Sequence, residues 1–374
     1  MNDLYIGLMS GTSLDGVDGV LVTFGSRGEA NIQVLAHAHR PFASSLTAEL
    51  MALNSPGEQE LHRAALAGTA LALVCNEVVG ALLDTAAISG DLVTSIGAHG
   101  QTVRHCPGAF DGIGYTLQLN NPALLAELTG IDVIADFRSR DVAAGGQGAP
   151  LAPAFHRAVF GRADTDVAVL NIGGFSNLTV LQAGGATLGF DCGPGNALMD
   201  LWCLRHTGRA YDDEGAWAAS GRIDAALLAA LRAEPFFAAP PPKSTGRDLF
   251  HAEWLAKHLA LGAASSLPPN DVQATLAELT ASICADDLRR FAPLVTELLV
   301  GGGGAFNRHV MTRLSTLLAG VRVMPTSERG LPPDQVEACA FAWLAREFGA
   351  RRAGNLPAVT GAKGERVLGA LYPA

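Results

Sequence analysis

The chain has 374 residues, a length for which two domains of ordinary size are the default expectation. Hydrophobic residues make up 49% of it, charged residues 17%, and 43 residues are glycine. This composition excludes disordered, collagen-like and coiled-coil proteins and favours a globular α/β protein with many tight turns. The formal net charge of −10 argues against nucleic-acid binding, because an acidic surface repels the phosphate backbone. Small phosphorylated ligands remain possible, since a local nest of backbone N–H groups can bind them.

Cysteine usage and the apolar segments indicate a cytoplasmic protein. Six cysteines are scattered without a C-x-x-C pair, so we expect neither a disulfide framework nor a zinc ribbon. The start of the chain lacks the basic and apolar regions of a secretory signal peptide. The most apolar stretch, residues 64–83, carries Asn76 and Glu77, which favours a buried helix over a membrane span.

The first half of the chain predicts a layered α/β domain. Residues 4–24 consist of two apolar runs around a turn of glycine and hydroxyl residues, a pattern typical of a β-hairpin. Periodicity then predicts two helices and two short strands. In chain order these are helix 61–83, strand 95–98, helix 122–128 and strand 131–135. Residues 138–153 fit neither the helical nor the strand period, so this segment can be a domain crossing, a ligand loop or both.

The second half repeats the opening pattern. Residues 167–190 again consist of apolar runs around a glycine turn, which suggests duplicated domains. The proline-rich residues 235–244 are expected to form a stiff surface loop. A helix is predicted from Asn270 to about Arg290. A strand at 298–300, four glycines and a helix ending near Gly320 follow.

Three glycine-rich turns, at 10–16, 173–177 and 301–304, each follow an apolar strand. Common nucleotide and hydrolase signatures are absent, including G-x-x-x-x-G-K-[ST], G-x-G-x-x-G and G-x-S-x-G. One turn alone can be an ordinary hairpin loop or a strand-to-helix linker. Three together favour a polyanion that is bound by backbone N–H groups from several sides. Asp15 and Asp18, beside the first turn, can hold a hydrated Mg²⁺ ion.

Asp191 is the candidate general base, because it ends a strand just before a predicted helix start. The alternative is a turn or capping aspartate, the commoner role for such a residue. Its neighbour Cys192 lacks an adjacent histidine and is expected to be a small buried residue rather than a nucleophile.

Other polar residues each allow a structural and a functional interpretation. His99 and Gln101 follow a strand end, where side chains point toward ligands, although a lone histidine is more often a hydrogen-bonded core residue. Arg138 can be solvated or can pair with a substrate carboxylate. Glu337 stands three residues after Asp334, the spacing of a capping box. Lys243, like Arg247, can be a surface charge or an anion contact.

Taken together, these motifs resemble the anhydro-N-acetylmuramic acid kinases, members of the sugar kinase, heat-shock chaperone and actin superfamily. The matching segments cover nearly the whole chain in order: LMSGTSLDGVD (8–18), AHGQTVRH (98–105), ADFRSRDVAAGGQGAPLAP (135–153), NIGGFSNLT (171–179), FDCGPGNALMD (190–200), PPKSTGRDLF (241–250), GGGGAFNRHVM (301–311) and VEACAFAWLA (336–345). Two residues depart from the family pattern, since Cys192 stands where threonine is expected and Phe306 where histidine is expected.

The resemblance implies an actin-like ATPase (ribonuclease H-like) fold with two α/β domains, each a five-stranded mixed sheet with flanking helices, and a cleft between them. Residues 1–135 with 350–374 would form one domain, and residues 136–349 the other. The resemblance also implies a homodimer that uses ATP and Mg²⁺, with metal ligands that it does not identify. The residues implied for the nucleotide are Gly11, Thr12, Ser13, Leu14, Asp15, Gly16, Val17, Asp18, Gly173, Gly174, Gly301, Gly302, Gly303 and Asn307.

The implied reaction opens 1,6-anhydro-N-acetylmuramic acid with water and phosphorylates O6, a step in the recycling of cell-wall peptidoglycan sugars. Asp191 would be the catalytic base, and His99, Gln101, Arg138 and Glu337 would contact the sugar. Two other functions stay open: a hexose kinase of the same superfamily that phosphorylates a free hydroxyl, and a nucleotide-switched binding protein. Solvent oxygen at C1 of the product separates the two kinases, and stimulation of ATP turnover by an anhydro sugar separates both from the binding protein.

Overall fold

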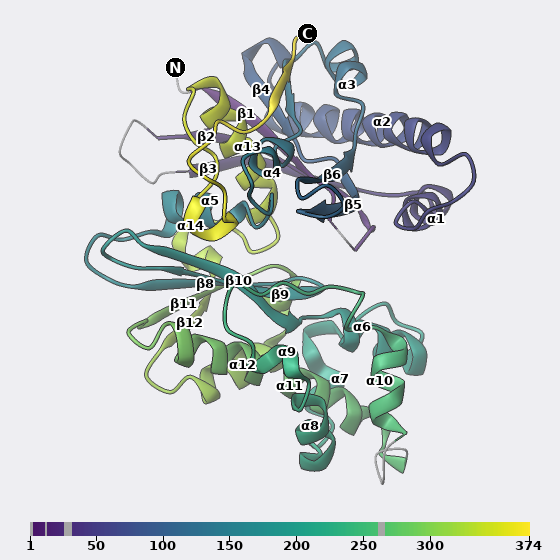
Figure 1. Cartoon of the computed structure of the whole chain (residues 1–374), viewed down its shortest axis with the longest axis vertical. Helices are drawn as coiled ribbons and strands as arrows, with labels where there is room; N and C mark the ends of the chain where they lie inside the picture. Colours follow the sequence, from purple (N-terminus) through teal and green to yellow (C-terminus); the bar gives the residue numbers. More distant parts are fainter. Residues whose placement is uncertain (1–2, 12, 26–31, 261–265) are drawn as a thin grey trace. The chain divides into compact units, whose positions relative to one another are not determined.

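The computed structural model describes residues 3–11, 13–25, 32–260 and 266–374. Two compact units are present, Met1–Val159 with Gln335–Ala374, and Phe160–Asp334 (Figure 1). The predicted boundaries differ from these in two segments, because residues 136–159 and 335–349 belong to the first unit. One reason is Asp141, a fully buried residue whose Oδ1 accepts hydrogen bonds from Asn355 and Thr360 near the C-terminus. Burial of that carboxylate ties the irregular segment to the first unit.

The first unit contains a mixed sheet with the strand order β13-β7-β4-β1-β2-β3. Its strands are β1 (Leu4–Met9), β2 (Gly16–Phe24), β3 (Ile32–Pro41), β4 (Val93–Ala98), β7 (Val133–Ala135) and β13 (Ala370–Tyr372). The sheet has six strands rather than the five expected, because the short C-terminal strand β13 pairs antiparallel with β7. β1 and β2 form the predicted hairpin, and β1 pairs in parallel with β4. A separate two-stranded sheet consists of β5 (Gln101–Pro107) and β6 (Gly114–Leu119).

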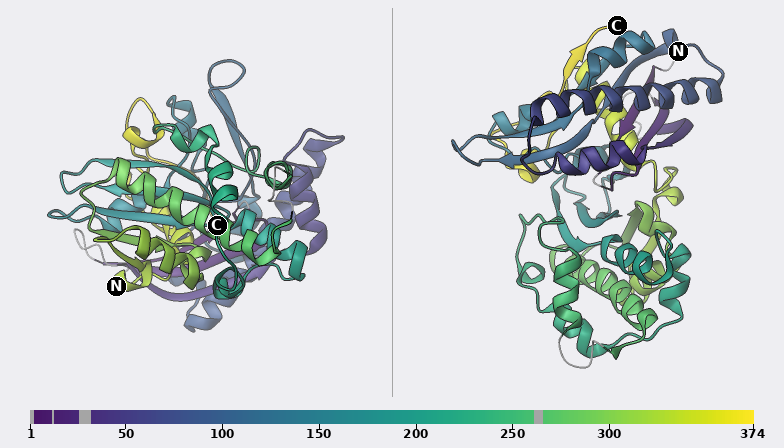
Figure 2. Two further views of the ribbon diagram at one scale, coloured as in Figure 1. Left: turned by 90° about the horizontal axis from the view of Figure 1, so that it is seen from below. Right: turned by 90° about the vertical axis from the view of Figure 1, so that its right-hand side faces the viewer.

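Helices cover both faces of this sheet. The helices of the unit are α1 (Ser44–Ala52), α2 (Glu60–Ala86), α3 (Pro122–Thr129), α4 (Ser139–Ala143), α5 (Ala152–Phe160, at the unit boundary), α13 (Val336–Gly349) and α14 (Pro357–Thr360). Gly19 faces Val78 and Leu82 of α2, whereas the neighbouring strand residue Gly7 faces α13. Gly7 pairs with Val20, the residue that follows Gly19 in β2. Because successive side chains of a strand point to opposite faces, α2 and α13 lie on opposite sides of the sheet. Figure 2 shows α2 lying along the unit as its longest helix.

The second unit repeats the plan with the strand order β10-β9-β8-β11-β12. Its strands are β8 (Val167–Ile172), β9 (Phe175–Leu181), β10 (Thr187–Pro194), β11 (Glu297–Gly301) and β12 (Arg322–Pro325). The antiparallel pairs β8–β9 and β9–β10 and the parallel pairs β8–β11 and β11–β12 correspond to those of β1, β2, β3, β4 and β7 in the first unit. The duplication suggested by the repeated hairpin is therefore present in the topology.

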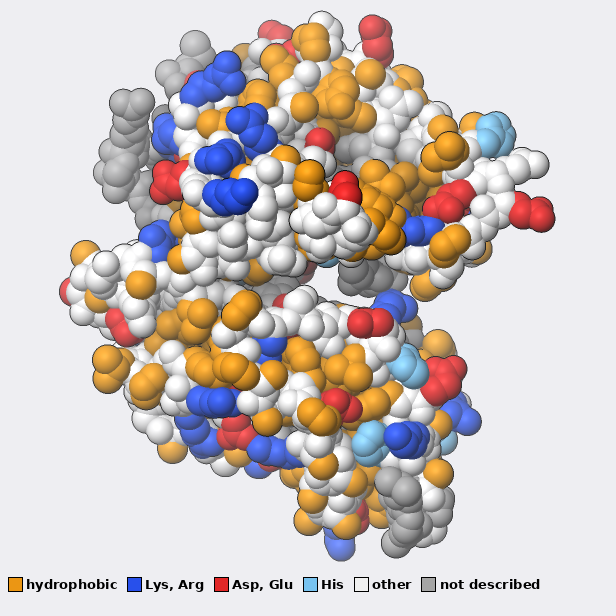
Figure 3. Space-filling view, viewed as in Figure 1, with side chains coloured by type: hydrophobic (Ala, Val, Ile, Leu, Met, Phe, Trp, Pro, Cys, Tyr) orange, Lys and Arg blue, Asp and Glu red, His pale blue; other side chains and the backbone are white. Residues whose placement is uncertain are grey.

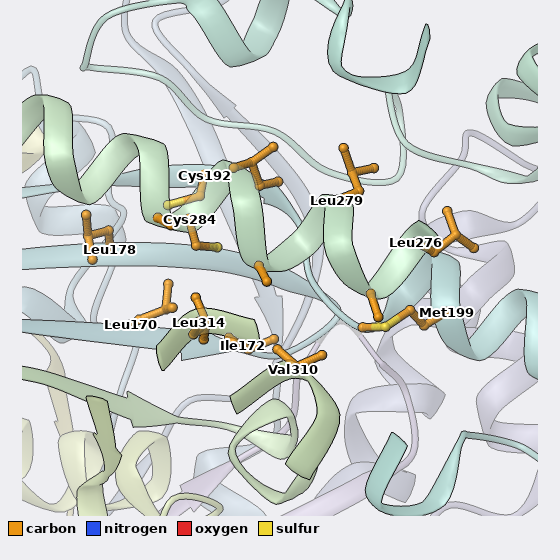
Figure 4. Packing of buried hydrophobic residues seen from close by; sticks show 14 of the residues in the cluster. Leu170, Ile172, Leu178, Cys192, Met199, Leu276, Leu279, Cys284, Val310 and Leu314 are labelled. Carbon is orange, nitrogen blue, oxygen red and sulfur yellow. The ribbon is translucent and has the colours of Figure 1, made fainter. Parts of the chain in front are cut away.

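Helix α11 forms the centre of the second core. The helices are α6 (Ala197–Thr207), α7 (Ala216–Ala219), α8 (Ala225–Arg232), α9 (Pro235–Ala238), α10 (Ala252–Leu259), α11 (Pro269–Phe291) and α12 (Arg308–Leu317). Leu276 and Leu279 of α11 share one apolar cluster with Leu170 and Leu178 of the sheet and Val310 of α12 (Figure 4). The helix predicted from Asn270 is confirmed.

The proline-rich segment 235–244 is not only a loop. Pro235 begins the short helix α9, because proline lacks only a backbone donor that is unpaired in a first helical turn. At the other end of the segment, the side chain of Lys243 is 4% exposed, so the interpretation of Lys243 as a surface charge is wrong. Over the second unit, acidic and basic side chains on the face in view are interspersed with apolar ones (Figure 3).

Within the described residues, α2 alone is long and apolar enough to cross a membrane by length and composition. Of its most apolar window, 44% is buried inside the protein. Leu71, Val78 and Leu82 of this helix belong to the core of the first unit. A core helix passes the same length and composition test, so this feature is weak evidence for a span.

Candidate active site

The first glycine turn joins β1 to β2, and its residue Thr12 lies outside the described residues. The N–H of Leu14, which has φ +58°, donates to the carbonyl of Gly11 at 3.3 Å. The side chains of Leu14 and Val17 are buried in the core, so these two residues can offer a ligand only their backbone. A Cβ at Gly16 would lie 2.2 Å from the carbonyl oxygen of Arg40, whereas one at Gly11 would meet no atom closer than 3.7 Å. Gly16 is therefore required by packing, and the open side of this turn is at Gly11.

His99 connects this turn to the end of β4. Nε and Nη2 of Arg138 lie 3.2 and 3.0 Å from Nε2 of His99, and Nδ1 of the same ring lies 3.2 Å from the carbonyl oxygen of Ser10. Because arginine can only donate, Nε2 is the acceptor and Nδ1 carries the proton that is donated to Ser10. Burial, and secondly the charge of Arg138, lower the pKa of His99 to about 3. The imidazole is neutral and fixed in one tautomer.

Gln101 and Arg138 are bound in the same network. Ser10 Oγ donates to Oε1 of Gln101, which is 1% exposed. Nη1 of Arg138 donates to the carbonyl of Gly148 at 2.9 Å. Desolvation lowers the pKa of Arg138 to about 10, and the charges of Glu337 and Asp141 oppose this shift. Arg138 therefore stays charged at neutral pH.

Glu337 reaches this region through the close approach of α13 to the sheet. A Cβ at Gly7 would lie 1.9 Å from the carbonyl oxygen of Ala338, and one at Gly97 would lie 2.1 Å from that of Phe341, so only glycine allows this packing. Glu337 keeps solvent contact and is not part of a capping box, since Gln335 is the N-cap and makes no side-chain cap bond. Desolvation raises the pKa of Glu337, Arg138 lowers it, and repulsion from Asp18 and Asp15 raises it. We call Ser10, His99, Gln101, Arg138 and Glu337 the Arg138 cluster.

In the second unit, the other two glycine turns meet at the start of α6. The N–H groups of Asn196 and Ala197 donate to the carbonyls of Gly173 and Gly174 at 2.8 and 3.1 Å. A Cβ at Gly303 would lie 3.5 Å from Nδ2 of Asn196. The structure thus brings together the turn at 173–174, the turn at 301–304 and the start of α6, where the N–H groups of Asn196 and Ala197 are bonded within the protein.

The glycines of these turns divide into two kinds. A Cβ at Gly302 would lie 2.5 Å from Oδ1 of Asn171, and one at Gly304 would lie 2.4 Å from Cγ2 of Ile172, so packing requires both. At Gly173, Gly174 and Gly303 a Cβ would meet no atom closer than 3.5 Å. The backbone is thus open to a ligand at these three glycines.

Gly301 and Asn307 have structural positions at the ends of the third turn. Gly301 ends β11 and pairs with Asn171 of β8. The side chain of Asn307 accepts the N–H of Val310 at 3.0 Å as the N-cap of α12. Phe306, one of the two departures from the family pattern, is 54% exposed.

Asp191 lies on β10 at a bulge and is held by the segment 243–245. Its backbone N–H donates to the carbonyl of Lys243 at 3.1 Å. Its Oδ2 accepts hydrogen bonds from Ser244 Oγ at 2.9 Å and from the N–H of Thr245 at 3.0 Å. Desolvation raises the pKa of Asp191, while these two bonds and the charge of Lys243 act in the opposite direction. It is a partly buried, oriented carboxylate rather than a helix cap.

Lys243 in turn binds Asp287 of α11, with 2.9 Å between Nζ and Oδ2. We call Asp191, Lys243, Ser244, Thr245 and Asp287 the Asp191 cluster. Single-residue patterns in the sequence do not predict Ser244, Thr245 and Asp287 as site residues. The motif PPKSTGRDLF held the signal for the first two, but their contact with position 191 spans 53 residues or more and exists only in the fold.

Metal-binding capacity is limited in the described part of the chain, where no group of three or more His, Cys, Asp or Glu residues is arranged to hold a metal ion. Asp15 is exposed and accepts a bond from Ser13 Oγ at 2.7 Å, and Asp18 lies 3.0 Å from Nδ1 of His39. Mg²⁺ keeps several waters and needs only one or two carboxylates, so these two aspartates are compatible with it.

A sequence model of the family described as anhydro-N-acetylmuramic acid kinase matches residues 3–374. The chain belongs to this family. The predicted family is thus confirmed, and with it the enzyme class, because a kinase is a phosphotransferase.

Curated relatives extend this result over the full length. The anhydro-N-acetylmuramic acid kinase of Albidiferax ferrireducens is 60% identical over 394 residues, which cover 100% of both chains. The one of Variovorax paradoxus is 61% identical over 379 residues, which cover 100% of this chain and 99% of the relative. Among solved structures, the (R)-2-hydroxyglutaryl-CoA dehydratase component A of Acidaminococcus fermentans matches with a TM-score of 0.50 at 12% identity, covering 91% of this chain and 96% of that one. This similarity shows the fold alone and agrees with the predicted fold of two α/β units, each with a mixed sheet and flanking helices.

Proposed function

We propose that the protein converts 1,6-anhydro-N-acetylmuramic acid, ATP and water to N-acetylmuramic acid 6-phosphate and ADP, as part of the recycling of cell-wall sugars. The observation that carries the proposal is the family match over residues 3–374. It is supported by Asp191, a carboxylate oriented by two hydrogen bonds.

In the proposed reaction, the oxygen of a water molecule attacks C1 of the sugar while the C1–O6 bond breaks. The freed O6 attacks the γ-phosphorus of ATP, and the bond to ADP breaks. Asp191 takes the proton of the attacking water, as the base of an inverting glycosidase does. The bridging oxygen is a poor nucleophile while it is bonded to C1, so opening and phosphorylation are coupled.

The state of Asp191 fits this role. Desolvation raises its pKa, which makes the carboxylate a stronger base than an ordinary aspartate. Ser244 and Thr245 both donate to Oδ2, so Oδ1 is the oxygen proposed to receive the proton. The carboxylate is active when it is deprotonated, and activity is therefore expected to fall as the pH drops through its pKa.

The remaining residues have binding roles in the proposal. The open glycines Gly11, Gly173, Gly174 and Gly303 let the backbone approach the nucleotide closely. Asp15 and Asp18 would hold a hydrated Mg²⁺, which offsets charge on the phosphate oxygens. The polar side chains proposed to bind the sugar are His99, Gln101, Arg138 and Glu337. Of these, Arg138 supplies the positive charge for the sugar's carboxylate.

A cytoplasmic homodimer is part of the proposal. All six cysteines are free, which agrees with a reducing compartment. Light scattering on the purified protein tests the dimer, and a mass of 38.7 kDa would contradict it.

Heavy-oxygen water tests the reaction. With purified protein, ATP, magnesium and the anhydro sugar, solvent oxygen is expected at C1 of the phosphorylated product. Absence of the label would favour a hexose kinase that acts on a free hydroxyl. ATP turnover that no anhydro sugar stimulates would favour a nucleotide-switched binding protein.

A further inference from the structure

A buried lysine lies beside the proposed base. The side chains of Lys243 and Asp287 are 4% and 6% exposed, and Nζ lies 2.9 Å from Oδ2 and 3.2 Å from Oδ1 of the carboxylate. The ammonium group is also 5.0 Å from the centre of the Phe236 ring and 5.7 Å from that of Phe190. Aromatic faces and a carboxylate therefore surround the charge.

Stability is a weak explanation for such a pair. Removing two charges from water costs several kcal/mol per ion, and apolar side chains of similar volume are often as stable or more so. The Lys243–Asp287 pair is connected directly to Asp191, the proposed base. Phe190 precedes Asp191 in β10, and Lys243 precedes the two residues that donate to the carboxylate.

Segment 243–245 has one anchor at each end. At one end, the side chain of Lys243 is fixed to α11 through Asp287. At the other, Ser244 Oγ and the N–H of Thr245 bond Oδ2 of Asp191, and the carbonyl of Lys243 accepts the backbone N–H of Asp191. Movement of the lysine would therefore displace both donors from the carboxylate.

We infer that the Lys243–Asp287 ion pair is a positioning device for the base, which holds segment 243–245 so that Oδ2 of Asp191 is occupied and Oδ1 faces the water. This inference rests on the proposed function, because it assumes that Asp191 removes a proton. Lys243 and Asp287 touch no reacting atom and act through Ser244 and Thr245.

The charges around the pair are few. Lys243 is the charged side chain that acts on Asp191, and it favours the ionised carboxylate. Asp287 faces Lys243, the Cys192 thiol and the charge of Arg290. Burial raises the pKa of Cys192 well above its ordinary value, so this thiol stays neutral. Burial also raises the pKa of Asp287 and Lys243 opposes that shift, so loss of Lys243 alone would raise the pKa of Asp287 further, whereas loss of both charges removes this second titrating group.

The test uses Lys243→Met and the double variant Lys243→Met with Asp287→Asn. The single variant leaves a buried carboxylate without its partner, which can prevent folding, whereas the double variant removes both charges. For the double variant we expect kcat to fall roughly 10- to 100-fold, the range for a mispositioned catalytic group. The acid limb of the kcat profile should move to higher pH, and the KM for ATP should not change.

Arg313→Met is the matched control. Arg313 also forms an ion pair with α11, through Glu278 at 2.6 Å, but neither residue contacts Asp191. We expect this variant to lose stability in thermal unfolding while its acid limb stays in place. A folded double variant with wild-type kcat and an unmoved acid limb would overturn the inference, as would an equal pH shift in Arg313→Met.

The two proposals fail in different ways. If Asp191→Asn keeps turnover, the proposed function loses its base. If Asp191→Asn is inactive and the folded double variant behaves as wild type, the positioning role alone is wrong.

Discussion

The Arg138 cluster and the Asp191 cluster use burial in opposite ways. In the first, a cation donates to an imidazole that burial keeps neutral, with its pKa lowered to about 3. In the second, burial raises the pKa of a carboxylate, and two donors and a lysine partly offset the shift. Desolvation disfavours the charged form of any group. It therefore keeps His99 unprotonated, so that this residue cannot act as an acid, and it makes Asp191 a stronger base. The first cluster is suited to recognition by fixed hydrogen bonds and the second to proton transfer.

The largest effect is expected for Asp191→Asn. An amide keeps the shape of the side chain but cannot accept the proton, and loss of a general base typically costs about 10²- to 10⁴-fold in kcat. ATP affinity, measured by calorimetry, should remain. If turnover stays within a few-fold of wild type, the Asp191 cluster does not transfer protons, and the proposed difference between it and the Arg138 cluster is lost.

Ser244→Ala is the graded companion of that variant. It removes one of two donors to Oδ2 and leaves the carboxylate in place. Turnover should survive at a reduced level, and an effect as large as that of Asp191→Asn would mean that Ser244 itself takes part in the chemistry.

Arg138→Gln tests the recognition cluster. A hydrogen bond to a charged group contributes about 1.5–3 kcal/mol, so kcat/KM for the anhydro sugar should fall on the order of 10- to 100-fold. The KM for ATP should stay within a few-fold of wild type. The acid limb of kcat should not move, because burial remains the first cause of the low pKa of His99. A shift of that limb would show that the Arg138 cluster also takes part in proton transfer.

Gly303→Val tests the proposed binding of ATP at the open glycines of the second unit, a role separate from that of Asp191. A Cβ at this position would meet no atom of the protein closer than 3.5 Å. ATP affinity should weaken by about tenfold, the equivalent of 1.4 kcal/mol. Gly184→Val, in the β9–β10 turn with no atom within 4 Å of its Cβ, is the control and should bind ATP normally. Gly302→Val is a poor probe, because it would clash with Asn171 and Ile172 of the protein itself.

The buried residues His99 and His156 affect stability at mildly acidic pH. Burial lowers the pKa of His99 and of His156 from 6.5 to about 3, so between these values the unfolded chain binds protons that the folded chain does not. The free energy of unfolding should therefore fall as the pH drops below 6.5, by about 1.4 kcal/mol per pH unit for each histidine. His156→Gln should reduce this slope by one histidine's share in urea unfolding at several pH values. An unchanged slope would contradict the low pKa.

Local patterns in the sequence were enough to predict part of the secondary structure. The hairpins at 4–24 and 167–190, the helices now labelled α2, α3, α11 and α12 and the strand at 298–300 follow from periodicity and glycine placement. The sixth strand of the first sheet was missed, because three residues, Ala370–Tyr372, are too few to show a period. Helix α9 was missed because proline is compatible with a first helical turn as well as with a loop.

The candidate site likewise divides into features that the sequence predicts and features that it does not. Motifs identified the family and drew attention to Asp191, Arg138 and the glycine turns. They could not separate Gly302 from Gly303, since the two differ in backbone φ and in what surrounds the position of a Cβ, and both depend on the fold. Nor could they show that Glu337 lies outside a capping box, because the spacing from Asp334 is the same in either case.

The sequence by itself determined the chemical groups, the two hairpins and the family, because these depend on residue identity and on spacing over a few residues. Tertiary structure alone decided that Lys243 is buried against Asp287, that Ser244 and Thr245 bind Asp191, and that burial keeps His99 neutral while Ser10 and Arg138 fix its ring. These contacts join residues 39 to 89 positions apart, and desolvation depends on the atoms packed around a group, which local sequence does not specify.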